Sequence, residues 1–138
     1  MGVVMTGRYT GGKSVELTHE PSGAVITTDA PKDNGGEGKA FSPTDLVGAA
    51  LGSCVVTTMV LVAERHGIAL TGAHFRVEKI MSTDPRRIGQ LLLAVHLPQS
   101  LSDIDRQKLE RAGAACPVHK SVHPDTQMVL EFVYDVAH

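Results

Sequence analysis

The segment from Ser42 to Gly67 constrains the fold more than any other part of the chain. Ser42 predicts a helix N-cap, Pro43 suits the first helical position, and Asp45 lies in the first turn, where the helix dipole favours an acid. Gly67, directly after His66, predicts where the helix stops. Between these ends the residues are apolar or small on nearly every face. We therefore expect a long helix that is packed on all sides or against a second copy of itself.

A membrane span is not expected from this helix. Its apolar stretch, residues 46–63, is interrupted by small and hydroxylated residues and is followed directly by Glu64 and Arg65. The interrupting residues are Gly48, Gly52, Ser53, Thr57 and Thr58. We interpret the segment as a buried core helix and do not expect a membrane among the partners of the protein.

Strand patterns lie on both sides of the helix. Before it, alternating residues and tight turns predict a three-stranded meander at residues 3–9, 14–19 and 24–28. After it, strands are predicted at residues 70–81, 88–97 and 128–134. The run at residues 91–95 could also be helical on propensity alone. The glycine-rich stretch at residues 29–40 has no apolar period and predicts a loop long enough for a functional role.

Two further helices are predicted near the C-terminus. A helix capped by Ser102 is expected to end near Gly113 and to turn Ile104 and Leu109 inward. A short helix follows at residues 116–122. The resulting order, βββ-α-ββ-αα-β, predicts the α+β class, with a single domain over the whole chain, residues 1–138.

Composition narrows the class of protein. The 138 residues are 42% hydrophobic and 20% charged, with a formal net charge of -2, so the core needs no disulfide and nucleic acid is not an expected partner. The N-terminus shows no signal-peptide pattern, and we expect a reducing, cytoplasmic compartment. The two cysteines are therefore expected to be free thiols unless their chemistry oxidises them.

The two cysteines, Cys54 and Cys116, have different local settings. Cys54 lies in mid-helix, where a cysteine is most often a small buried hydrophobe and the dipole does not stabilise a thiolate. Cys116 precedes Pro117 and is expected at a helix N-cap, where free N–H groups and Lys120 would lower a thiol pKa. Local chemistry favours Cys116 as the more reactive thiol, and an inert cap thiol is the alternative.

A metal site is an alternative role for the second cysteine. Cys116, His119 and His123 follow a C-x-x-H-x-x-x-H spacing and would share one face of a short helix. Neither a fourth ligand for a structural zinc ion nor a second-shell partner for a catalytic one is visible nearby. The remaining histidines show no pair spacing and are interpreted as surface or satisfied core residues: His19, His66, His74, His96 and His138.

Two motifs, in this order along the chain, point to a known family. They are Ser42-Pro43-Thr44-Asp45-Leu46-Val47-Gly48-Ala49-Ala50-Leu51-Gly52-Ser53-Cys54 and Cys116-Pro117-Val118-His119-Lys120-Ser121-Val122. With the glycine-rich loop at residues 29–39, they closely resemble the OsmC/Ohr family of osmotically inducible and organic-hydroperoxide-resistance proteins. The resemblance covers nearly the whole chain and is nearer to the general OsmC-like branch.

The resemblance implies an assembly and an activity. The assembly is an intertwined homodimer of α+β subunits, with the Cys54 helix at its centre and the active sites at the subunit interface. Cys54 would be the peroxidatic cysteine and Cys116 the resolving one, which reverses the order that local chemistry favours. An organic hydroperoxide would be reduced through a Cys54 sulfenic acid and a Cys54–Cys116 disulfide, which an external dithiol reduces without a cofactor. A binding or storage member of the fold without peroxidase activity is the remaining alternative.

A Cys54 thiolate would need a cation or strong donors, because an apolar site raises a thiol pKa. In the best-studied family members, an arginine held by a glutamate near the start of the central helix supplies the charge. Here Asp45 is the shorter substitute for that glutamate, and Lys39 is the candidate cation. Lys32 in the same loop and Arg8 on the first strand are the other cations, and both lysines could equally be solvated loop residues.

Overall fold

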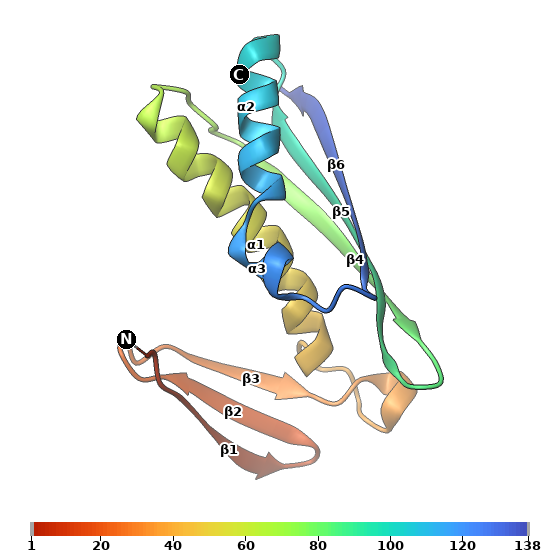
Figure 1. The fold of residues 1–138 in the computed structure, drawn as a ribbon. Coiled ribbons are helices and arrows are strands. Elements are labelled where there is room, and N and C mark those ends of the chain that lie inside the picture. The colour runs from red at the N-terminus through yellow and green to blue at the C-terminus, as the bar shows by residue number, and fades with distance from the viewer. Residues whose placement is uncertain (1, 138) are drawn as a thin grey trace. The chain divides into compact units, whose positions relative to one another are not determined.

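The computed structural model describes residues 2–137 and confirms the predicted order of strands and helices. Its internal packing divides the chain into two compact units, the first ending at Val47 and the second beginning at Gly48. Figure 1 labels the elements of both units. The α+β class is confirmed, and a single domain over residues 1–138 stays a prediction.

The first unit begins with an antiparallel meander. Strands β1 (Met5–Gly11), β2 (Ser14–His19) and β3 (Val25–Asp29) pair in the order β1-β2-β3, as alternation predicts. The tight turn after β1 requires positive φ angles, which glycine adopts without a Cβ clash, and Gly12 has a φ of 62°. On the paired strands β1 and β2, Arg8 and Glu16 lie opposite each other and form an exposed ion pair of 3.2 Å.

A closed loop follows the meander in the first unit. It contains a short 3-10 helix, η1 (Lys32–Asn34), and its ends are tied where the Asp29 N–H donates to the Phe41 carbonyl at 3.1 Å. Gly36 passes so close to Ala30 that an added Cβ would lie 1.7 Å from its carbonyl oxygen. Glycine is therefore needed where the backbone of this segment passes close to Ala30.

Helix α1 (Pro43–Arg65) begins and ends where local signals predict. Ser42 caps its N-terminus, since the Ser42 hydroxyl accepts the Asp45 N–H at 3.1 Å. Gly67 follows the last turn with a φ of 65°, the left-handed conformation that ends many helices.

The second unit contains a three-stranded sheet with mixed pairing. Strands β4 (His74–Ser82) and β5 (Arg87–Pro98) are antiparallel, whereas β5 and β6 (Gln127–Val136) are parallel. Helices α2 (Asp103–Ala114) and α3 (Pro117–Ser121) form the long crossover that parallel neighbours require. The ambiguous run at residues 91–95 is strand.

The core of the second unit lies between its helices and one face of this sheet (Figure 1). The fully buried aliphatic side chains alternate along β5 and recur every fourth residue along α1: Leu91, Leu93, Val95, Leu97, Leu51, Val55 and Met59. Glycines bring the backbones close, because an added Cβ at Gly52 would lie 2.2 Å from the Phe75 ring of β4. A Cβ added at Gly113 would likewise crowd Val55 and Met59, so this glycine lets α2 approach α1 closely.

The outward side of α1 is not covered by the rest of the second unit. Leu61 is 51% exposed, and Ala50, Ser53 and Thr57 are exposed as well. Helix α1 is long and apolar enough to cross a membrane. The core helices of soluble proteins can have the same length and composition. The buried stripe of α1 against the sheet agrees with a core helix that has one uncovered face.

One core prediction on α2 is wrong. Leu109 is fully buried as predicted, but Ile104 is 74% exposed. Residues five apart on an α-helix differ by about 140° around its axis, so the two cannot share a face. The buried side of α2 is formed by Leu109 and Gly113.

Candidate active site

Cys116 lies at the N-cap of α3. Its Sγ accepts the His119 N–H at 3.3 Å, and Pro117 occupies the first helical position. The residue is completely buried, whereas Lys120 of the same helix is exposed. The predicted cap is confirmed, and its backbone donor points at the sulfur.

Cys54 lies in the middle of α1, at the edge of the buried stripe and half-buried. Packing of α1 against α2 and the sheet brings this side chain close enough to Cys116 to influence the pKa of the Cys116 thiol. Both cysteines are free thiols in the structure. Two neighbouring thiols of unequal exposure can support oxidation of one and disulfide formation with the other.

The pKa of the Cys116 thiol is raised above its usual value. Burial is the main cause, and the hydrogen bond to Cys54 and the charge of a Cys54 thiolate raise it further. The N–H groups of His119 and Val118 act in the opposite direction but do not compensate. The expectation of a lowered Cys116 pKa is therefore wrong, because complete burial outweighs the donors at the cap.

Alkylation should reveal this difference between the thiols. At neutral pH we expect iodoacetamide to modify Cys54 well before Cys116, because alkylation needs an accessible thiolate. The raised pKa also affects the free energy of unfolding. The protonated Cys116 thiol contributes to that free energy below the usual thiol pKa of 9.0, and the contribution is lost as the pH rises through the pKa of the folded protein. Peptide mass spectrometry over time gives the order, and faster labelling of Cys116 would contradict it.

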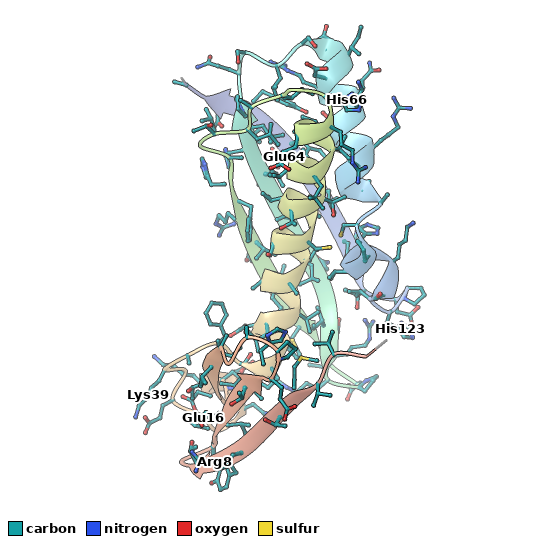
Figure 2. All side chains as sticks on the ribbon, turned by 90° about the vertical axis from the view of Figure 1, so that its left-hand side faces the viewer. Arg8, Glu16, Lys39, Glu64, His66 and His123 are labelled. Carbon is teal, nitrogen blue, oxygen red and sulfur yellow. The ribbon has the colours of Figure 1, made fainter. Side chains whose placement is uncertain are left out.

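The other predicted site residues belong to the first unit, and each has a local partner there. The ammonium of Lys39, which Figure 2 labels, pairs with Glu37 at 2.6 Å, and this hydrogen bond raises the pKa of Lys39. Asp45 accepts the Ser42 N–H at 2.9 Å and so completes a reciprocal helix cap. The structure thus brings Cys54 and Cys116 together in one unit and places Asp45 and Lys39 in the other.

Asp29 is a structural residue that the sequence analysis did not single out. It is 3% exposed, and its carboxylate accepts the Lys39 N–H at 2.9 Å and the Ser14 hydroxyl at 3.5 Å. The hydrogen bond from Lys39 is the main reason why the pKa of Asp29 lies below its usual 3.8. An aspartate at a strand end before a glycine-rich loop is the signal that could have identified it.

Removing the Asp29 carboxylate should loosen the loop. In Asp29→Ala we expect the Lys39 amide to exchange faster by roughly an order of magnitude, because its acceptor is lost. The depressed pKa means that the stabilisation is present above pH 3.8 and is lost as the pH falls through the folded value. NMR-detected hydrogen exchange measures the effect. Glu37→Gln, which removes only the Lys39 side-chain partner, should leave the amide protected, and equal exchange in all three proteins would contradict the role of Asp29.

The predicted metal ligands do not come together. Helix α3 ends at Ser121 and Val122 is extended, so His123 does not continue the face that carries Cys116 and His119. The His123 ring instead accepts the Asp125 N–H at 3.0 Å. Within residues 2–137, no group of three or more His, Cys, Asp or Glu side chains could hold a metal ion. The interpretation of these residues as ligands on one helix face is wrong.

Known proteins resemble this chain over nearly its full length. A solved structure from Psychrobacter arcticus 273-4, of a protein named for an osmotic stress and detoxification response, is 35% identical with a TM-score of 0.90 and covers 96% of this chain and 97% of that one. A Legionella pneumophila structure named as an organic hydroperoxide resistance protein is 19% identical, with a TM-score of 0.72 and coverage of 96% and 97%, and shows likeness of fold. An uncharacterised protein of Acinetobacter baylyi is 25% identical over 130 residues, 93% of this chain and 91% of that protein.

The family model of the OsmC-like proteins matches residues 36–131, which include both cysteine motifs. This range is more than half of the chain. The chain therefore belongs to the OsmC-like protein family, as the resemblance of its two cysteine motifs predicts.

Proposed function

We propose that the protein is a cytoplasmic thiol peroxidase that reduces organic hydroperoxides in oxidative stress defence. The observation that carries the proposal is the proximity of two free thiols of unequal exposure, a half-buried Cys54 and a fully buried Cys116 whose pKa Cys54 raises. Membership of the OsmC-like family supports it, and so does the name of the Legionella protein with the same fold.

The first step is oxidation of Cys54. Its thiolate attacks the distal oxygen of the hydroperoxide, the O–O bond breaks, and the alkoxide leaves as an alcohol after taking up a proton. The neighbouring Cys116 S–H is suited to supply that proton, since its raised pKa keeps it protonated at neutral pH. Cys54 is left as a sulfenic acid.

The second step is activated by the first. Burial is the main cause of the raised pKa of Cys116 and the charge of Cys54 adds to it, so oxidation of Cys54 to a neutral sulfenic acid removes that added part. Cys116 has given its proton to the leaving alkoxide, and the N–H groups of His119 and Val118 partly stabilise the resulting thiolate. This thiolate displaces hydroxide from Cys54 to form the disulfide, and the hydroxide takes up a proton from solvent, equivalent to the one that Cys54 lost on ionising, and leaves as water. An external dithiol then returns both thiols while it is itself oxidised to a disulfide.

We propose further that the active protein is a homodimer of single-domain subunits. Within residues 2–137, the completely buried apolar side chains all belong to the second unit, while the first unit exposes Met5, Tyr9, Val25 and Ile26. The outward face of α1 is also uncovered. A second copy would bury these surfaces, and sedimentation velocity at micromolar concentration should give the mass of a dimer.

Asp45 and Lys39 stay predicted members of the catalytic set.

The test is consumption of cumene hydroperoxide with a dithiol reductant, followed by mass spectrometry of the enzyme after a peroxide pulse without reductant. We expect multiple turnovers and a Cys54–Cys116 disulfide. Faster reduction of hydrogen peroxide would contradict the organic substrate class. Two thiols that remain reduced under excess of both peroxides would instead indicate a binding or storage protein and overturn the peroxidase.

A further inference from the structure

Two histidines far apart in sequence face each other on the sheet of the second unit. His74 begins β4 and is paired in register with His96 of β5. Their rings are stacked, with centroids 4.7 Å apart and planes within 2°. The next residue of β4, Phe75, contacts α1, and alternate residues of a strand point to opposite faces. The histidine pair therefore lies on the face of the sheet that is turned away from the core.

Both rings are oriented through Nδ1. The His96 Nδ1 lies 2.9 and 3.0 Å from the two carboxylate oxygens of Asp135 on β6, and the His74 Nδ1 lies 3.0 Å from the Gly72 carbonyl oxygen. Carboxylates and carbonyls only accept hydrogen bonds, so Nδ1 carries the proton in each ring. In the neutral imidazoles, the lone pair is therefore on Nε2.

We propose that His74 and His96 bind a borderline divalent cation such as Zn²⁺ through their Nε2 atoms. Imidazole nitrogen is a preferred ligand of Zn²⁺, and a ligating histidine almost always donates its other N–H to a carboxylate or a backbone carbonyl. His96 has such a partner in Asp135, which we assign as a positioning residue. Since no larger group of ligands is present within residues 2–137, water completes the coordination.

Binding requires a rotation of one ring. A metal ion lies in the plane of each imidazole that binds it, so two parallel stacked rings cannot direct both lone pairs at one ion. His74 is exposed at the first residue of its strand, whereas the side chain of His96 is 26% exposed and is held by Asp135. The His74 ring therefore turns toward His96, and both the stack and the hydrogen bond from the His74 Nδ1 to the Gly72 carbonyl are lost on binding.

The site is tested by calorimetric titration of Zn²⁺ into the Cys54→Ser, Cys116→Ser double variant. Removal of the thiols eliminates competing sulfur ligands, and because this background has no peroxidase cysteines, the result is independent of the proposed function. We expect one ion per chain, and affinity at least tenfold weaker after His74→Ala or His96→Ala. His66→Ala, which removes an exposed histidine at the end of α1, is the matched control and should not change binding (Figure 2).

The role of Asp135 needs its own variants. Asp135→Asn should weaken Zn²⁺ binding by about 10–100-fold, and Asp135→Glu, which keeps the acceptor, should recover most of it. The ¹⁵N shifts of His96 should show a change of tautomer in Asp135→Asn, an effect that a general loss of structure would not produce.

NMR of the unsubstituted histidines provides a second readout where a variant does not fold. Zn²⁺ should shift the ring protons of both His74 and His96, because each loses the ring current of its stacked neighbour. Binding that is unchanged in His74→Ala and His96→Ala, or ring resonances that do not respond to millimolar Zn²⁺, would overturn the site.

Discussion

Cys54→Ser is expected to reduce hydroperoxide turnover to the uncatalysed background, whereas Cys116→Ser should still consume one equivalent of hydroperoxide per subunit. A serine hydroxyl is not ionised at neutral pH, so Cys54→Ser lacks the nucleophile. In Cys116→Ser the first step remains possible, but the sulfenic acid finds no partner thiol and accumulates. The two variants are expected to differ because Cys116 is buried and protonated and therefore does not replace Cys54 as the nucleophile.

Single-turnover assays with dimedone trapping and mass spectrometry separate these cases. Gln107→Ala changes an exposed residue of α2 and serves as the control, with turnover expected to match the unsubstituted protein. Undiminished turnover in Cys54→Ser would exclude it as the peroxidatic residue. A sulfenic acid trapped on Cys116 would instead support the order that local chemistry favours.

Gly52→Ala is expected to destabilise the protein by about 1–2 kcal/mol. Alanine is favoured over glycine within a helix by about 1 kcal/mol, but overpacking a core costs about 1–3 kcal/mol or more. Here the added Cβ would lie 2.2, 2.4 and 2.7 Å from three carbons of the Phe75 ring, which is rigid and half-buried against α1. The clash therefore outweighs the gain in propensity. Because Cys54 is two residues farther along α1, turnover should fall as well.

Urea denaturation gives the free energy of unfolding of each variant. Gln107→Ala, an exposed position inside α2, is the control and should be neutral or slightly stabilising. Phe75→Leu in the Gly52→Ala background removes the ring, and a double-mutant cycle should show a favourable coupling between the two substitutions. A Gly52→Ala protein as stable as the parent would show that α1 and β4 separate at little cost.

The parts of the fold that depend on neighbouring residues could be predicted from sequence. Ser42, Pro43 and Gly67 define the ends of α1 through caps and backbone conformation, and these act within a turn of the chain. The meander follows from alternation and tight turns in the same way. The cap geometry of Cys116 was also predictable, because Pro117 favours the first helical position.

Features that arise from distant segments could not be predicted. The pKa of Cys116 is decided by its burial and by Cys54, which lies more than sixty residues away in the chain. His74 and His96 come together only through the register of β4 and β5, so their spacing carries no pattern. Ile104 was misplaced because two apolar residues on one helix were assumed to share a face.

The crossover between β5 and β6 has a consequence for how the chain matures. Cys116 lies in this connection, so pairing of the parallel strands completes the crossover that holds Cys116 beside Cys54. Parallel pairing closes a long loop and is a slow, non-local event in folding. During synthesis Cys54 emerges well before residue 116, and until the crossover is complete it is an isolated thiol. During refolding, the yield of the Cys54–Cys116 disulfide should therefore rise as β5 and β6 pair. This yield then reports how far the pairing has progressed at each time.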